Sequence, residues 1–121
     1  MDFENVVGKT IDSIEGMEED SEEILFILDG KKYKMFHVQD CCESVRVAEV
    51  IGGKSEDLVG QKILDAYESS EDASNDVENG VLESGTWTFY TIRTMDTSVT
   101  IRWLGESNGY YSEYVSFECC S

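Results

Sequence analysis

The chain has 121 residues, of which 40% are hydrophobic and 11% aromatic, and this is the size and composition of one folded domain, residues 1–121. Its 26 acidic residues face nine basic ones, which gives a formal net charge of −17. Such a surface repels nucleic-acid phosphates and anionic membranes and attracts basic proteins, because affinity for polyphosphate comes largely from Lys and Arg. We therefore expect no direct binding to nucleic acid or to a membrane.

The first third of the sequence has the pattern of antiparallel strands. Ile11 and Ile14 mark a short strand candidate, and residues 24–28 (ILFIL) form a nearly continuous apolar run typical of a buried strand. Asp29-Gly30 predicts a tight turn, and the alternating residues 33–38 predict the returning strand. Together these segments predict a hairpin.

The middle of the chain is less regular. Residues 45–51 alternate and stop at a glycine pair, which predicts another strand. Residues 56–67 favour a short helix or turn, although Ile63-Leu64 could begin a strand. Residues 65–83 carry seven acids and no base, so we expect a long acidic loop between two folded halves.

The C-terminal part predicts a three-stranded antiparallel meander. Residues 86–94 are rich in aromatic and β-branched side chains, and residues 98–104 and 110–119 alternate in hydrophobicity. Short turns join them, the second containing Asn108-Gly109. The whole chain is therefore predicted to be mainly β (a β-rich α+β protein). We expect an antiparallel curved sheet or half-barrel of five to seven strands, with at most one or two short helices and the acidic loop.

Three segments resemble a known family. They are HVQDCCESV at 37–45, TWTFYTIRT at 86–94 and TIRWLGESNGYYSEYV at 100–115. Together they are similar to a domain-of-unknown-function family of small proteins encoded by bacteriophages and by bacterial genomes that carry prophages. The resemblance extends from about Gly8 to Phe117 and implies a phage or prophage origin. It implies no catalytic residues.

The sequence also suggests a compartment. The start Met1-Asp2-Phe3-Glu4 lacks the basic and apolar character of a secretion signal, and no apolar stretch approaches the roughly 20 residues that cross a bilayer. We therefore expect a cytoplasmic protein, in the host cytoplasm if it is phage-encoded. In that compartment the vicinal pairs Cys41-Cys42 and Cys119-Cys120 are expected to be reduced thiols.

His37, Cys41 and Cys42 are the weak candidates for a metal site. Imidazole and thiolate are zinc ligands, and Cys119-Cys120 could complete a tetrahedral set if the two halves meet. However, adjacent residues on a strand point to opposite faces, and zinc motifs usually separate their cysteines. We therefore predict no bound metal and no other cofactor, with one thiol of each pair packed as a small hydrophobic group and the other near the surface.

Two further chemistries have weak support. Asp40 and Glu43 flank the vicinal cysteines and would disfavour the thiolate that Cys-His catalysis needs. An EF-hand-like spacing of Asp72, Ser74, Asp76 and Glu83 has Val77 at the place where the calcium loop requires glycine. We expect neither cysteine catalysis nor a calcium site.

A set of aromatic and arginine residues could bind a nucleotide-sized ligand or a protein, because Arg and aromatic groups dominate such contacts. Packing within the sheet is the alternative role for most of them. The candidates are Trp87, Tyr90, Arg93, Arg102, Trp103, Asn108, Tyr110, Tyr111 and, less centrally, Tyr114.

The acidic residues concentrate in two segments, residues 15–23 and 65–83, which hold 13 of the 26 acids and no base. Carboxylates on a rigid scaffold can imitate phosphates and occupy the basic channel of a partner. The candidate partner-binding acids are Glu15, Glu18, Glu19, Asp20, Glu22, Glu23, Asp65, Glu68, Glu71, Asp72, Asp76, Glu78 and Glu83.

Three functions follow, in order of preference. The first is a non-enzymatic, acidic inhibitor of a basic host defence or nucleic-acid-binding protein such as a CRISPR effector, acting as a nucleic-acid mimic. The second is a protein that sequesters a small nucleotide-like signal on the aromatic and arginine residues. The third is a metal-binding or cysteine-dependent protein. An aromatic sheet could also pair with a second copy of the chain.

Overall fold

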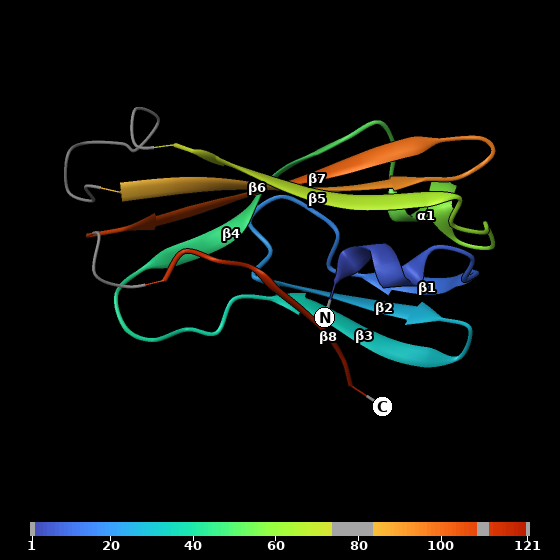
Figure 1. The fold of residues 1–121 in the computed structure, drawn as a ribbon, viewed down its shortest axis with the longest axis horizontal. Coiled ribbons are helices and arrows are strands. Elements are labelled where there is room, and N and C mark those ends of the chain that lie inside the picture. Colours follow the sequence, from blue (N-terminus) through green and yellow to red (C-terminus); the bar gives the residue numbers. More distant parts are fainter. Residues whose placement is uncertain (1, 74–83, 109–111, 121) are drawn as a thin grey trace.

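A computed structural model describes residues 2–73, 84–108 and 112–120 (Figure 1). It confirms a mainly antiparallel β chain with two short helical segments. No helix in the described ranges is long and apolar enough to span a bilayer. In chain order the elements are η1 (Phe3–Val6), β1 (Ile11–Glu15), β2 (Glu23–Leu28), β3 (Lys31–Phe36), β4 (Ser44–Ile51), α1 (Ser55–Leu58), β5 (Asp65–Asp72), β6 (Ser84–Arg93), β7 (Ser98–Ser107) and β8 (Ser116–Cys119).

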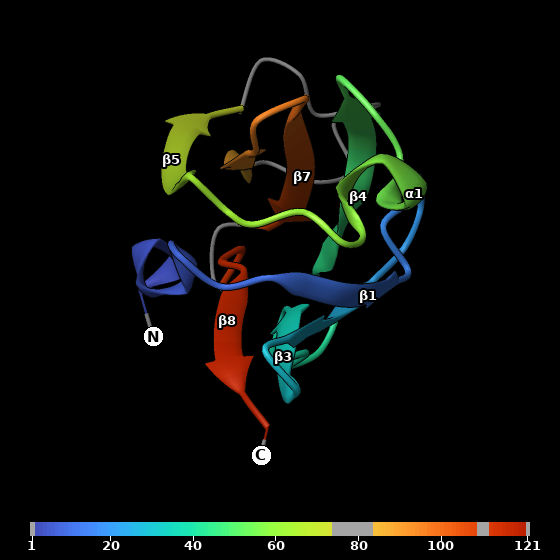
Figure 2. The same ribbon diagram turned by 90° about the vertical axis from the view of Figure 1, so that its right-hand side faces the viewer.

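The strands are divided between two four-stranded sheets rather than lying in one curved sheet. The first sheet has the order β1-β2-β3-β8, and the second has the order β4-β7-β6-β5. Figure 2 shows the second sheet stacked above the first. Each sheet therefore has an inner face, which buries apolar side chains against the other sheet, and an outer face.

The core lies between the two inner faces. Tyr33 and Met35 alternate inward from β3, and Val99, Ile101 and Trp103 alternate inward from β7. The Trp103 indole N–H donates to the Met35 sulfur across the sandwich at 3.2 Å. Truncation of a buried tryptophan costs typically about 3–5 kcal/mol, so this contact between the sheets is a major source of stability.

The hairpin of β2 and β3 is confirmed, with its strands paired from Glu23↔Phe36 to Leu28↔Lys31. Asp29 and Gly30 both adopt positive φ, 49° and 78°. This is the conformation that a two-residue hairpin turn requires, and Asp-Gly adopts it at low cost.

The predicted meander is wrong in its third strand. β6 and β7 pair along their whole length, but β8 leaves the second sheet and pairs with β3 of the first. The intervening segment Ser112–Val115 passes over Gly105, where a Cβ atom would lie only 2.6 Å from the Glu113 carbonyl oxygen. Alternation predicted the strand but did not identify its partner, because the pairing is set by this close crossing.

The predicted acidic loop is wrong in its first part. All eight residues of Asp65–Asp72 form β5 and pair with β6. Acids and serines have low strand propensity, but the aromatic partner strand overrides that preference. Residues 74–83 lie outside the described residues. The ambiguous segment 56–67 contains only the end of the single helical turn α1, followed by the start of β5.

Candidate functional site

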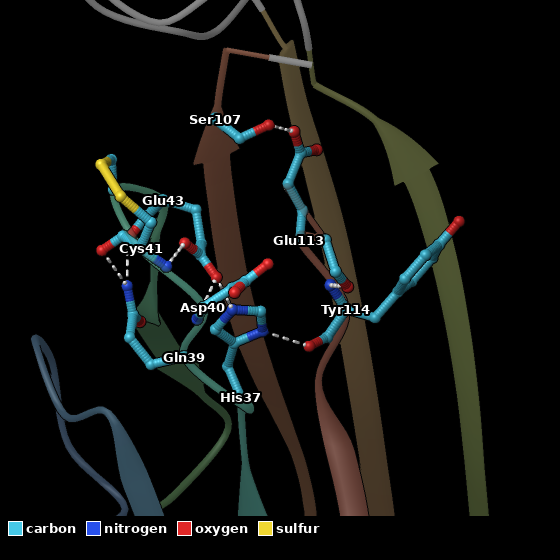
Figure 3. A network of polar contacts seen from close by, with 10 residues as sticks. His37, Gln39, Asp40, Cys41, Glu43, Ser107, Glu113 and Tyr114 are labelled. Atoms are coloured by element: carbon cyan, nitrogen blue, oxygen red, sulfur yellow. Dashed lines mark hydrogen bonds and ion pairs between the residues drawn. A yellow bond between two sulfur atoms is a disulfide. The ribbon is translucent and has the colours of Figure 1, made fainter. Parts of the chain in front are cut away.

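A buried polar network occupies the connection between β3 and β4 (Figure 3). The His37 ring lies between two acceptors: Nδ1 is 2.7 Å from the carbonyl oxygen of Tyr114, and Nε2 is 2.7 Å from Glu43 Oε2. The His37 side chain is 3% exposed and that of Glu43 is fully buried. The Tyr114 carbonyl oxygen can only accept, so Nδ1 donates to it, and Nε2 faces the Glu43 carboxylate.

Glu43 organises the loop around its own carboxylate. It accepts backbone N–H groups from Asp40 at 2.8 Å and from Cys41 at 2.9 Å, in addition to the His37 contact. The hydrogen bond from His37, followed by these backbone donors, lowers the pKa of Glu43 to about 2. Gln39 completes the loop by donating to the carbonyl oxygens of Cys41 and Glu43. The group is therefore ionised and engaged in holding the loop.

A second buried carboxylate, Glu113, holds the segment that crosses between the sheets. Thr86 Oγ1 donates to it at 2.7 Å, and the Ser107 hydroxyl donates to its other oxygen. The next two residues are held as well, because His37 donates to the Tyr114 carbonyl and the Tyr90 hydroxyl donates to that of Val115. These hydrogen bonds thus fix the segment that crosses from the second sheet to the first.

Glu113 was not a candidate in the sequence. The signal that could have revealed it is an acid within the alternating apolar pattern of residues 110–119, at a position where an inward-facing side chain is expected. Such an acid needs buried donors, and Thr86 and Ser107 supply them.

One of the two cysteine pairs differs from the predicted thiol state. The structure joins Cys41 to Cys42 by a disulfide, whereas Cys119 and Cys120 are exposed thiols. The two pairs do not meet, because Cys119 pairs with Tyr33, toward the far end of β3 from His37. Within the described ranges no group of three or more His, Cys, Asp and Glu side chains is arranged to hold a metal ion.

The first acidic segment forms the connection between β1 and β2. All six of its acids are exposed, and Glu23 pairs with Lys34 at 2.9 Å. The backbone is anchored to β4: Asp20 N–H donates to the Val47 carbonyl, and Val47 N–H donates to the Ser21 carbonyl, both at 2.8 Å. The carboxylates of this β1–β2 loop (residues 15–23) are therefore carried on a backbone tied to the edge of the second sheet.

The second acidic segment provides β5 at the opposite edge of that sheet. Asp65 pairs with Arg93 at 3.8 Å, and Glu68, Glu71 and Asp72 are exposed. The calcium spacing begins in a strand at Asp72, and its remaining positions lie outside the described residues, as do Asp76, Glu78 and Glu83.

The aromatic and arginine candidates divide between the core and the surface. Tyr90 and Trp103 are fully buried, so placing them in a surface site was wrong; both alternate inward to the core. Burial raises the pKa of the Tyr90 phenol. Asn108 and Tyr114 are exposed, and Tyr110 and Tyr111 lie outside the described residues.

The outer face of the second sheet carries all three arginines of the chain. The Arg102 guanidinium stacks 4.4 Å from the Trp87 ring and bonds Glu49 at 2.5 Å. The other two pairs are Arg46 with Glu106 at 2.8 Å and Arg93 with Asp65. Every arginine already has a carboxylate neighbour, so this face combines aromatic groups with balanced charge.

A family model described as a domain of unknown function, DUF7448, matches residues 4–117. No curated protein and no solved structure matches the chain. The family match confirms the resemblance to a domain-of-unknown-function family and covers nearly the whole chain.

Proposed function

Because the chain belongs to the DUF7448 family, a domain of unknown function that carries no assigned chemistry, we propose a function from its own geometry. We propose that it is a non-enzymatic binding protein of phage type, which inhibits a basic, nucleic-acid-binding host protein by occupying the surface where that protein binds phosphates. A CRISPR effector is one such target.

The observation that carries this proposal is the β1–β2 loop. Its acids are all exposed, and two backbone hydrogen bonds to Val47 fix the loop against β4. Carboxylates on an anchored backbone lose less conformational entropy on binding than carboxylates on a loose tail. They also attract a basic surface at long range, which raises the association rate.

The polar network gives independent support to a non-enzymatic role. Both His37 nitrogens are engaged, and Glu43 is bonded to His37 and to two backbone donors. A general base must reach a substrate proton, and neither group presents an open atom for that purpose. The balanced outer face likewise offers weaker support to the nucleotide-binding alternative, because each arginine has a carboxylate beside it.

A pull-down from bacterial lysate tests the proposal. Three baits are compared: the native protein, a loop variant with Glu18→Gln, Glu19→Gln and Glu22→Gln, and a control variant with Glu56→Gln, Asp96→Asn and Glu118→Gln. Both variants remove the same number of exposed charges.

We expect the native and control baits to retain a basic protein at about 50 mM salt and to release it near 200 mM, as charge-driven contacts do. Added DNA should compete for the same partner. Retention by the loop variant equal to that by the native protein, or binding insensitive to salt and DNA, would contradict the proposal.

A further inference from the structure

β5 is an edge strand, paired with β6 on one side and with no described strand on the other. It is the last strand of the second sheet, and its register with β6 runs without a shift over Asp65–Asp72. Ala73 N–H donates to Gly85, its partner in that register, so strand alternation turns the N–H groups of Glu68 and Ser70 away from β6. These groups lie on the edge at which another strand could pair.

Several of the usual devices that block such an edge do not occur in β5. Proteins protect edges with prolines, lysines, bulges or very short strands. β5 has eight residues and an unshifted register, the chain contains no proline, and the strand contains no lysine. It carries acids instead, which repel a second acidic copy of the chain but not a basic strand.

A hollow lies beside the middle of this edge. Its volume is about 360 Å³, and η1 forms its other side, close to β5 in Figures 1 and 2. This is at the small end of the range for ligand pockets, about 300–1,000 Å³, and one long side chain fits within it. The lining residues are Asp2, Phe3, Glu4, Glu68, Ser69 and Ser70.

The charge of the hollow selects a cation. Asp2, Glu4 and Glu68 contribute three carboxylates to its wall. Burial raises the pKa of Glu68, a hydrogen bond with Tyr90 opposes this rise, and repulsion by the negative charge of Asp2 adds a smaller increase. An ammonium or guanidinium group would relieve this repulsion.

We propose that β5 receives an extended basic segment of the partner protein. The segment adds to the second sheet as a fifth strand and places a lysine or arginine side chain among Asp2, Glu4 and Glu68. Strand addition supplies affinity through main-chain hydrogen bonds, and the hollow supplies specificity through one side chain. The inference rests on the proposed function. It specifies that the basic partner binds at this edge as an extended segment.

Peptide binding measured by fluorescence anisotropy tests it. The probe is a labelled peptide of alternating lysine and threonine, as long as β5. The comparison peptides are the same sequence with its threonine amides N-methylated, which keeps the charge and removes main-chain donors, and a peptide of alternating glutamate and threonine. We expect the lysine peptide to bind, N-methylation to weaken it at least about tenfold, and the glutamate peptide not to bind.

Variants of the protein locate the site. Ser70→Pro removes an edge donor at a position where edge strands tolerate proline, and the pair Glu4→Gln and Glu68→Gln neutralises the hollow. Each is expected to weaken the lysine peptide about tenfold or more, whereas the control pair Glu56→Gln and Asp96→Asn leaves it within about twofold. Far-UV circular dichroism and thermal unfolding establish that each variant is folded.

Equal affinity for the lysine peptide and its N-methylated form would overturn strand addition, as would binding of the glutamate peptide or self-association through β5. These failures are distinguishable from failure of the proposed function. If the loop variant loses the partner and Ser70→Pro keeps it, the inhibitor proposal stands and the β5 inference falls. Added protection of the Glu68 and Ser70 amides from hydrogen exchange, on peptide binding, would support the inference directly.

Discussion

Glu43, Glu106 and Glu113 are buried and bonded, whereas the acids of the β1–β2 loop face solvent. Glu43 accepts from His37 and two backbone amides, Glu106 pairs with Arg46, and Glu113 accepts from Thr86 and Ser107. Of the loop acids, Glu23 forms an ion pair, with Lys34 at 2.9 Å.

The difference teaches that net charge is an incomplete guide to function. Buried carboxylates are ligands for the protein's own donors, and removing one leaves those donors unsatisfied. Exposed carboxylates contribute little to the folded state and so are available to a partner. Substitution of each group should therefore separate stability from binding.

The largest effect is expected for Glu113→Ala. Loss of the carboxylate leaves the Thr86 and Ser107 hydroxyls without their buried acceptor and frees the crossing segment, which should cost about 3 kcal/mol of unfolding free energy. Urea unfolding followed by tryptophan fluorescence measures it. The matched control is Glu118→Ala, an exposed acid on β8, for which a change within about 0.5 kcal/mol is expected. Equal losses of unfolding free energy in Glu113→Ala and Glu118→Ala would contradict the distinction between buried and exposed acids.

The second effect concerns Glu43 and pH. Its folded-state pKa, about 2, lies below the ordinary value of 4.5, so the carboxylate stabilises the native state fully above pH 4.5 and loses this contribution as the pH falls toward 2. The stability advantage of the native protein over Glu43→Gln should therefore shrink across that window. Denaturant unfolding of both proteins between pH 6 and about 2 measures it. If the difference in unfolding free energy between the native protein and Glu43→Gln stays constant over this pH range, the His37–Glu43 pair is not the source of that stability.

A smaller effect is expected for Arg102→Ala, which removes the half-buried cation stacked on Trp87 and paired with Glu49. Loss of about 1 kcal/mol in thermal or urea unfolding is expected, since such contacts are only partly shielded from water. Arg93→Ala is the comparison, because Arg93 is more exposed and its pair with Asp65 is longer. It should change stability by less than Arg102→Ala does.

The smallest effect on stability is expected for the loop variant Glu18→Gln, Glu19→Gln and Glu22→Gln. Its unfolding free energy should stay within about 0.5 kcal/mol of the native value, because these side chains face solvent. The same protein should lose the partner in the pull-down. If the loop variant loses stability as well as partner binding, these acids are structural residues like Glu43 and Glu113.

Local chemistry made part of the fold predictable. Asp29-Gly30 between two apolar runs specified the β2–β3 hairpin, and the aromatic and β-branched residues of 86–94 specified β6. These signals act within a few residues of the chain, so they can be interpreted without knowledge of distant contacts.

Non-local contacts account for what the sequence did not predict. β8 is paired with β3 because Glu113 and the neighbouring carbonyls are held by groups distant in sequence, including His37. β5 was taken for a loop because its acids and serines disfavour strands until β6 is present beside them. His37 was a weak metal candidate and Glu43 only an acid beside the cysteines, and their contacts with each other and with Tyr114 identify both as structural.

The pairing of β3 with β8 also has a consequence for synthesis on the ribosome. The β2–β3 hairpin emerges early, but the strand that completes the first sheet is translated roughly 80 residues later. During that interval the β3 edge is unpaired and the apolar side chains of Tyr33 and Met35 are not yet buried. Burial of that edge therefore waits until β8 has been synthesised, and the interval before it is when the nascent chain is most prone to aggregate.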